Sequence, residues 1–579
     1  MKFWQRIIIN RISENFLFFT ILLLLFTLPG WLYCITIYND YPLLRMIGWL
    51  LFITAMPALI SWLCCFIKSK IVRTFIYIIA VSLFAVNLFL ILNFSTMISP
   101  WILLLIHETN MNESSEFFET YSLSSASLIT YAFTILTVCI IIFTERISNK
   151  LSLKLSRYFT IPLCLWFIIG IYQAILIIQM FTLNTQSKLQ EWYDGKAFYC
   201  IENTPANLLY SLHHLYINSH ENDIAWEATE KALQSDISRI NNDTIDIVLV
   251  IGESYNKYHA SIYGYNLNTT PIQYQEQQRS NLFVFKDAVS PYNMTTLAVK
   301  NMLSTNSISL NQSWNEYPLV TTIFRQAGFD VAMWDNQKSE NSVLFHDFSN
   351  NSLLYSKKMI ESTYHHLNKR PFAYDQQLVD SAFTIKRYHS STFTVFHLMG
   401  QHTSPKWRYP QNDKHTLFTA DSIHRNDLNE EQRKYIAEYD NATYYNDYVI
   451  GNIINHYRHR NAVILYLSDH GDEVYDYRNV IGRTHEPAKD KLALKYQYDI
   501  PMVLWCSDIF IQRYPKTIEN IRKAVLKPFT SDNVPHLLMS LANIRSHYYE
   551  PLKDVLSEEY ECGTRIIQNT TDYDAVMNQ

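Results

Sequence analysis

The sequence predicts a membrane-anchored α/β protein, in which five membrane-spanning helices precede a polar domain built on a mostly parallel sheet covered by helices. Two observations favour this class. Apolar runs with almost no charge, each long enough to cross a bilayer, fill the first third of the 579-residue chain. In the rest, short fully apolar runs alternate with helical patterns, which is typical of buried parallel strands. We expect a transmembrane domain over residues 1–182, a bridging segment over 183–243 and a globular domain over 244–579.

Five apolar runs reach the length that a membrane helix needs. The first is too long for the core of a signal peptide and lacks a small-residue cleavage site, so we expect it to remain as an anchor. The predicted spans are residues 16–38, 46–67, 75–94, 122–143 and 159–181.

Basic residues set the orientation of these spans. Lys and Arg cluster before the first span, between the second and third, and between the fourth and fifth, whereas the other two loops hold Arg45 as their single base. By the positive-inside rule, the basic segments face the cytoplasm. With five spans, everything after residue 181 then lies on the outer side of the membrane.

The charge and the cysteine content argue against a nucleic-acid-binding protein and against a domain built on disulfides. The chain has a net charge of −5 and shows no basic stripe, so we expect no nucleic-acid partner and seek the partner in the membrane. Residues 97–108 are too short to cross and are expected to lie along the membrane interface. Of the eight cysteines, three lie outside the spans, Cys200, Cys506 and Cys562, so at most one disulfide can form among them.

The bridging segment carries a helical pattern over residues 203–215, and we expect its His213–His214 pair on the surface, not as metal ligands. After residue 243, apolar β-rich runs separated by helical stretches indicate five strands. The predicted strands are residues 245–253, 330–337, 391–402, 461–470 and 500–508.

Candidate metal ligands stand where several of these strands end. The carboxyl ends of parallel strands meet at one edge of a sheet, and carboxylates with imidazoles are a plausible set of zinc ligands. Simpler roles remain open for some acids: Asp335 as a capping or supporting group, and Asp472 with Glu473 as a solvated turn. The candidates are Glu253, Asp335, His397, His402, Asp469 and His470.

A candidate nucleophile lies in "SPYNMTTLAVKNMLST", residues 290–305, where Thr295 and Thr296 precede a helical pattern. A hydroxyl at a helix N-terminus beside a metal can be activated for attack, and the metal can neutralise a phosphoryl oxygen. Threonine is also an ordinary residue at the start of a helix, so this pattern alone leaves the role open.

Several motifs together resemble the lipopolysaccharide phosphoethanolamine transferases of the alkaline phosphatase and sulfatase superfamily. They are "VLVIGES", "YGYNLNTTP", a threonine before a helix, "HLMGQH" and "SDHGDEVYD". "GQHTSPKWRYP" and "YDNATYYND" are most similar to the branch that modifies the core heptose. With the five-span anchor, the resemblance covers nearly the whole chain. It implies a sulfatase-like catalytic domain in the periplasm, anchored in the bacterial inner membrane.

The resemblance also implies a zinc site with one or two ions. Glu253, Asp469 and His470 match the family's zinc ligands. Thr295 matches the nucleophile, which in the family also touches zinc, and it fits the family spacing better than Thr296.

Three histidines match further site residues of the family. His402, the second histidine of "HLMGQH", matches one that contacts the substrate phosphate and can protonate a leaving oxygen, and His397 matches the first. His485 in "GRTHEP" stands at the right distance beyond Asp469 to match the remaining catalytic and substrate-binding histidine.

Two departures from the family pattern stand out. The lipid A branch brackets its nucleophile loop with cysteines, but Pro291 and Asn301 occupy those positions here, so the loop must be held by packing. The lysine that some relatives place near the phosphate has only a loose counterpart in Lys338.

The resemblance implies transfer of phosphoethanolamine from phosphatidylethanolamine to lipopolysaccharide, at core heptose or lipid A, through a covalent threonine intermediate. The alternatives are a glycerol phosphotransferase of the lipoteichoic acid synthase type and a non-catalytic, metal-stabilised binding module of the envelope. Sulfatase activity is disfavoured, because no Cys-x-Pro or Ser-x-Pro stretch followed by Arg is present to form its modified nucleophile.

Overall fold

The computed structural model describes most of the chain in fourteen segments. They are residues 5–37, 43–94, 96–100, 102–103, 122–147, 157–185, 188–189, 192–193, 202–241, 243–337, 357–402, 404–483, 490–568 and 570–578. Cys200, Lys338, His485 and half of 97–108 lie outside the described residues. The chain divides into two units, residues 1–220 and 221–579. The domain borders at 182 and 243 stay a prediction.

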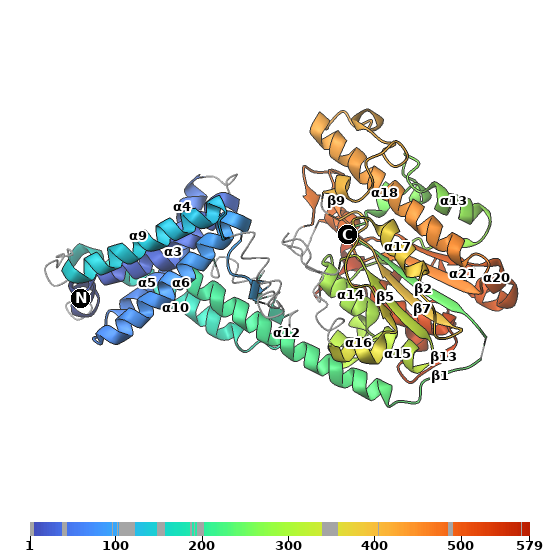
Figure 1. The fold of residues 1–579 in the computed structure, drawn as a ribbon, viewed down its shortest axis with the longest axis horizontal. Coiled ribbons are helices and arrows are strands. Elements are labelled where there is room, and N and C mark those ends of the chain that lie inside the picture. Colours follow the sequence, from blue (N-terminus) through green and yellow to red (C-terminus); the bar gives the residue numbers. More distant parts are fainter. Residues whose placement is uncertain are drawn as a thin grey trace. The chain divides into compact units, whose positions relative to one another are not determined.

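The first unit is a set of apolar helices. Four helices in the described residues are long and apolar enough to cross a membrane: α3 (Phe16–Ile37), α6 (Lys70–Phe94), α9 (Ser125–Ile147) and α10 (Thr160–Met180). The remaining predicted span is formed by two shorter helices, α4 (Leu43–Ile53) and α5 (Ala55–Cys64), separated only by Thr54. At the rise of an α-helix the two together reach about 30 Å, the thickness of a bilayer core. Helix α3 packs against α5 and α6, and α9 against α6 (Figure 1).

Helix α12 (Thr204–Leu233) is longer than the helix predicted over residues 203–215. His213 on this helix is 6% exposed, and its Nε2 lies 3.1 Å from the Leu183 carbonyl oxygen. The surface position predicted for His213 is therefore wrong, because the end of the preceding segment covers its ring.

The second unit is built on a seven-stranded sheet with strand order β3-β11-β8-β2-β7-β5-β6. Six of these strands run in the same direction, and β11 runs opposite to them, pairing antiparallel with β8 and β3. The predicted mostly parallel sheet is confirmed, and β3 and β6 are too short to leave a pattern in the sequence. The strands are β2 (Asp246–Gly252), β3 (Leu282–Val284), β5 (Asp330–Asp335), β6 (His366–Leu367), β7 (Thr392–His397), β8 (Ala462–Ser468) and β11 (Met502–Cys506).

Both faces of the sheet are buried, which explains why the strands read as continuous apolar runs. Successive side chains of a strand point to opposite faces. On β2, Leu249 joins the core beneath α14 (Thr295–Leu303), α15 (Val320–Gln326) and α22 (Val534–Leu541). Val248 joins the core beneath α17 (Asp375–Phe383) and α18 (Glu430–Tyr457). Figure 1 shows α14 and α18 on the two sides of these strands.

Shorter elements complete the second unit. The hairpin of β9 (Glu473–Val474) and β10 (Ile481–Gly482) follows β8 and borders the site described below. Cys506 lies buried on β11 and Cys562 is half-buried, and both are free thiols. The other elements are β1 (Ser238–Arg239) with β13 (Ile544–Arg545), β4 (Ala288–Val289) with β12 (Phe529–Thr530), β14 (Ile566–Ile567) with β15 (Thr571–Asp572), and helices α13 (Pro271–Gln278), α16 (Lys357–Thr363), α19 (Lys491–Tyr498), α20 (Asp508–Arg513), α21 (Pro515–Ala524) and α23 (Tyr573–Met577).

Candidate active site

The register of the central strands brings three predicted metal ligands together. Strands β2 and β8 are parallel neighbours, and their last residues, Gly252 and Ser468, are paired. Glu253 directly follows the first strand, and Asp469 and His470 directly follow the second. These side chains therefore leave the sheet side by side, although more than two hundred residues separate them along the chain.

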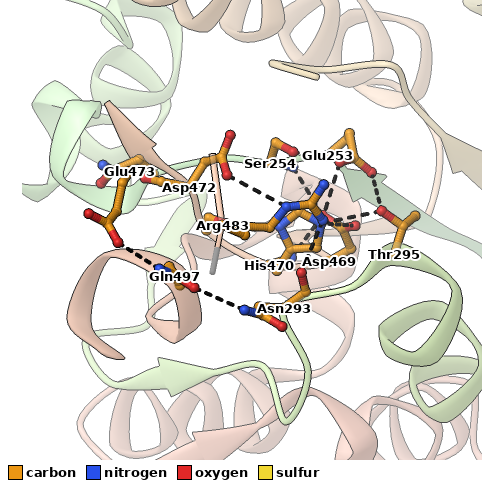
Figure 2. Close-up of polar contacts among 12 residues, drawn as sticks. Glu253, Ser254, Asn293, Thr295, Asp469, His470, Asp472, Glu473, Arg483 and Gln497 are labelled. Atoms are coloured by element: carbon orange, nitrogen blue, oxygen red, sulfur yellow. Dashed lines mark hydrogen bonds and ion pairs between the residues drawn. The ribbon is translucent and has the colours of Figure 1, made fainter. Parts of the chain in front are cut away.

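The three side chains form a closed cluster (Figure 2). The Nε2 atom of His470 lies 3.0 Å from Asp469 Oδ2 and 3.4 Å from Glu253 Oε1, and all three side chains are fully buried. Their ligand atoms lie within 4.8 Å of one another. Two carboxylates and one imidazole at this spacing suit a zinc ion.

The orientation of the His470 ring is set from its other side. Its Nδ1 lies 2.9 Å from the carbonyl oxygen of Gly471. Because a carbonyl oxygen only accepts hydrogen bonds, Nδ1 is the donor and Nε2 is the nitrogen that faces the carboxylates. Gly471 is required at this point, because a Cβ there would overlap the carbonyl oxygen of Tyr496.

The two oxygens of Asp469 have different environments. Oδ1 accepts hydrogen bonds from the backbone N–H groups of Ser254, at 3.1 Å, and His470, at 2.7 Å. Oδ2 is buried, makes no hydrogen bond within the described residues and faces the His470 ring. One oxygen thus fixes the side chain while the other remains directed into the cluster, as a metal ligand requires.

Thr295 borders this cluster as the first residue of α14. Its hydroxyl donates to Glu253 Oε2 at 3.0 Å and lies 3.2 Å from His470 Nε2. The side chain is half-buried. The N-terminal end of a helix carries a partial positive charge, which favours an oxyanion at this hydroxyl.

Glu253 is held by neighbours that the sequence did not single out. Its Oε1 accepts from Ser254 Oγ at 2.6 Å, and its Oε2 accepts from Gln337 Nε2 at 3.0 Å. The same Gln337 nitrogen donates to the Leu398 carbonyl oxygen at 2.8 Å. In "HLMGQH", Gly400 has φ +47° and approaches the Glu253 backbone so closely that a Cβ would lie 2.9 Å from its nitrogen.

Burial and proximity shift the pKa values of the two carboxyls in opposite directions. Burial raises the pKa of Asp469, and the charge of Glu253 raises it further. Burial acts on Glu253 in the same direction, but the adjacent His470 outweighs it and holds the pKa of Glu253 well below its usual value. Glu253 is therefore the firmly ionised member of the pair.

The histidines predicted to bind substrate occupy two different places. His397 ends β7, its register partner is Asp335 at the end of β5, and its Nδ1 lies 3.0 Å from Asp335 Oδ1. Both side chains are fully buried. This imidazole pairs with a carboxylate inside the domain and has no surface that faces a substrate.

His402 is half-buried beside the cluster, in a loop whose Gln401 N–H donates to the Glu253 carbonyl oxygen at 3.1 Å. Burial lowers the pKa of His402 to about 4, and the charges of Arg408 and Arg483 act in the same direction. Its ring is therefore neutral at pH 7. His485 lies outside the described residues.

The turn after His470 is buried, so the solvated turn expected at Asp472 and Glu473 is wrong. These residues are 6% and 1% exposed. Glu473 accepts from Gln497 Nε2 at 2.6 Å and from Arg478 Nε at 2.7 Å. Side chains from the following hairpin and from α19 cover the acids, which the local sequence does not reveal.

This buried turn is connected to the loop before Thr295. The Nδ2 atom of Asn293 donates to Gln497 Oε1 at 2.9 Å, and Gln568 Nε2 donates to Asn293 Oδ1 at 3.1 Å. Figure 2 shows the resulting row from Glu473 through Gln497 to Asn293. A polar network thus holds the loop before Thr295, where this chain lacks the two cysteines that flank the loop in the lipid A branch.

Arg483, which follows β10 directly, also lies at the cluster and was not predicted from the sequence. Its Nη1 lies 2.5 Å from His470 Nε2 and donates to the Asn293 carbonyl oxygen at 3.0 Å. The one available signal was its place in "GRTHEP", two residues before the predicted His485.

Comparison with known proteins agrees with this architecture. The family model described as "Sulfatase" matches residues 245–544, more than half of the 579-residue chain. The phosphoethanolamine transferase EptC of Escherichia coli (strain K12) is 25% identical over 492 residues, which cover 83% of this chain and 81% of that protein.

Solved structures show the same fold. The zinc complex of the C-terminal periplasmic domain of EptC from Escherichia coli has a TM-score of 0.50 and 24% identity, and the match covers 60% of this chain and 99% of that one. The integral membrane protein lipooligosaccharide phosphoethanolamine transferase A from Neisseria meningitidis has a TM-score of 0.52 and 15% identity, with 94% of this chain and 97% of that one covered. The kinship with phosphoethanolamine transferases predicted from the motifs is confirmed, and the chain belongs to the sulfatase family.

Proposed function

We propose that this protein is a zinc-dependent transferase that moves phosphoethanolamine from phosphatidylethanolamine to lipopolysaccharide, at core heptose or lipid A. One observation carries the proposal: the hydroxyl of Thr295 lies 3.0 Å from Glu253 and 3.2 Å from His470, at the start of a helix. The relatives named phosphoethanolamine transferases support the group transferred.

The residues present fit a zinc ion, because Glu253, Asp469 and His470 direct two carboxylate oxygens and one ring nitrogen to one point, beside the Thr295 hydroxyl. These four residues would hold the metal. When bound, zinc would favour the deprotonated hydroxyl and offset negative charge on a phosphoryl oxygen. The zinc complex of the Escherichia coli domain supports this choice of metal.

The chain's own residues support a two-step transfer. Thr295 Oγ attacks the phosphorus of the lipid, a new O–P bond forms, and the P–O bond to diacylglycerol breaks, so that diacylglycerol leaves as an alcohol. From the motif match, His402 is proposed to take up the proton of Thr295 and to return it to the leaving oxygen. His485 is proposed to share this role. An acceptor hydroxyl or phosphate then attacks the same phosphorus and releases Thr295.

The predicted membrane spans support a location of the protein in the membrane that contains its lipid substrate. Helices long enough to cross a membrane precede the catalytic unit, and the basic loops favour an orientation with that unit outside. We therefore assign the protein to the bacterial inner membrane, with the site in the periplasm, where a diacyl lipid headgroup can reach it.

The experiment uses the full chain in detergent with zinc and two labelled lipids, phosphatidylethanolamine and phosphatidylglycerol, offered separately. We expect diacylglycerol release from the first and, after proteolysis, a Thr295 peptide that carries phosphoethanolamine in the mass spectrum. Release from phosphatidylglycerol alone would favour glycerol phosphotransfer. Turnover with an unmodified Thr295 peptide would remove the covalent step.

A further inference from the structure

Arg483 places a permanent positive charge at the metal cluster. The β9–β10 hairpin pairs Glu473 with Gly482, so that the residue after Gly482 returns to the turn that carries His470. Its Nη1 lies 2.5 Å from His470 Nε2, the ring nitrogen that faces Glu253 and Asp469. A guanidinium stays charged at every pH that proteins tolerate.

Asp472 is the acid that pairs with this cation within the described residues. The carboxylates of Glu253 and Asp469 together offset the two positive charges of a zinc ion, so the loaded cluster is close to neutral. The carboxylate of Asp472 pairs with Arg483 at 3.6 Å from Nε, whereas Nη1 faces His470 Nε2 and the Asn293 carbonyl oxygen, which carries no net charge. The end of the guanidinium at the cluster therefore has no carboxylate hydrogen bond within the described residues, and it is available to an anion.

The nucleophile borders the same nitrogen. Thr295 Oγ1 lies 3.2 Å from His470 Nε2, so the guanidinium and the hydroxyl flank one atom. In Figure 2, Arg483 reaches the cluster from the side of Asp472, and Thr295 borders it on the other side. Because zinc would take the lone pair of Nε2, Nη1 would lose this acceptor in the loaded site and could donate instead to a non-bridging oxygen of a phosphorus attacked by Thr295.

From this geometry we propose that Arg483 binds the non-bridging oxygens of the phosphoryl group that reacts with Thr295. A guanidinium presents two parallel N–H groups that match two phosphoryl oxygens, and its charge compensates the phosphodiester. The side chain is 24% exposed, so it is reachable from solvent and can turn toward a substrate. The inference rests on the proposed function for the identity of the substrate, but it concerns any phosphoryl anion at this site.

A purely structural role makes a different prediction. If Arg483 only tied the hairpin to the nucleophile loop through the Asn293 carbonyl oxygen, its loss would reduce stability without a selective effect on anions. A phosphate-binding role requires that anion affinity falls while the zinc content and the fold remain.

The test measures binding of inorganic phosphate to the zinc-loaded full chain in detergent by calorimetry, with the zinc content of each sample determined. We expect Arg483→Gln to weaken phosphate binding by about ten- to hundredfold, and Arg483→Lys by less, because lysine keeps the charge and loses the fork. Arg279→Gln is the matched control, because Arg279 pairs with Glu276 at the end of α13, outside this hairpin, and should leave phosphate affinity unchanged.

Wild-type phosphate affinity in zinc-loaded Arg483→Gln would overturn the proposal, and so would a wild-type protein that binds zinc and no phosphate. Should the glutamine variant fail to fold, wild-type affinity in zinc-loaded Arg483→Lys would overturn it equally. Diacylglycerol release from phosphatidylethanolamine vesicles is measured in parallel. Arg483-dependent phosphate binding without that release would refute the donor and support the role of Arg483.

Discussion

Two pairs of strand ends in the same sheet carry the same kinds of side chain and differ in what surrounds them. At the ends of β2 and β8, Glu253 meets Asp469 and His470. At the ends of β5 and β7, Asp335 meets His397, with Nδ1 and Oδ1 3.0 Å apart. Both sets are fully buried.

The two places differ in how many possible metal ligands converge there. Asp335 Oδ1 also accepts from the Gln337 N–H at 2.7 Å. The buried Nε2 of His397 makes no hydrogen bond, and no second carboxylate pairs with this ring within the described residues. The other set has a second carboxylate and the Thr295 hydroxyl directed to the same point. A strand end with an acid and a histidine is therefore insufficient for a metal site, and convergence of further donors distinguishes the two.

The largest expected effect separates the two pairs directly. Asp469→Asn should reduce zinc content and lower activity by roughly 10³-fold or more, because a ligand and the activation of Thr295 are lost together. Asp335→Asn should keep zinc and lower stability by about 3 kcal/mol, because it breaks a buried ion pair. Zinc analysis, diacylglycerol release and thermal unfolding of both variants measure this contrast. Loss of zinc in Asp335→Asn would contradict the assignment of the metal to Glu253, Asp469 and His470 alone.

The next effect concerns the nucleophile. Thr295→Ala should lower activity by roughly 10³-fold while most zinc remains, because the three other ligands persist. Thr296→Ala, a matched change at the adjacent residue of α14, should retain activity within about tenfold. Activity assays and metal analysis on the same samples decide between them, and an active Thr295→Ala enzyme would exclude this residue as the nucleophile.

A smaller effect is expected at Gln337, which connects the two pairs. Gln337→Leu removes the donor to Glu253 Oε2 and should weaken zinc affinity or activity by about ten- to hundredfold, because groups that orient a metal ligand have effects of this size. Gln376→Leu is the control, because Gln376 pairs with Asp380 along α17 away from the cluster. Equal zinc titrations for wild type and Gln337→Leu would show that Glu253 needs no such support.

The smallest effect concerns a third Asp–His pair, away from the metal. His259 Nδ1 lies 2.7 Å from Asp440 Oδ1 and its Nε2 lies 3.4 Å from Asp476 Oδ1. Burial would lower the pKa of His259, but Asp440 and then Asp476 outweigh it and raise the pKa to about 10.

A raised pKa in the folded state stabilises the protein below the unfolded value of 6.5, and this stability is lost as the pH rises through about 10. His259→Gln should therefore lower the midpoint of thermal unfolding more at about pH 6.5 than at about pH 10. A constant difference between wild type and variant across this range would mean that His259 is neutral in the fold.

The strand ends explain which residues of the site could be predicted from the sequence. Apolar runs that stop at Glu253 or at Asp469 and His470 are visible locally, and Thr295 is visible as the start of a helical pattern. The sequence does not show which strands are neighbours, because the pairing of Gly252 with Ser468 depends on contacts between distant segments.

Residues supplied by loops and by a neighbouring strand end were missed for the same reason. Gln337 and Arg483 stand outside any periodic pattern, and only the folded chain brings them to Glu253 and His470. Glu473 follows the stretch Asp-His-Gly-Asp and resembles a solvated turn, but Gln497 from a later helix covers it.

Anomalous diffraction at the zinc edge from crystals of the full chain tests the central claim most directly. A zinc peak about 2.0–2.2 Å from oxygens of Glu253 and Asp469 and from Nε2 of His470, with Thr295 facing it, is the predicted result. A zinc ion held by Asp335 and His397, with none among the other three, would contradict the account.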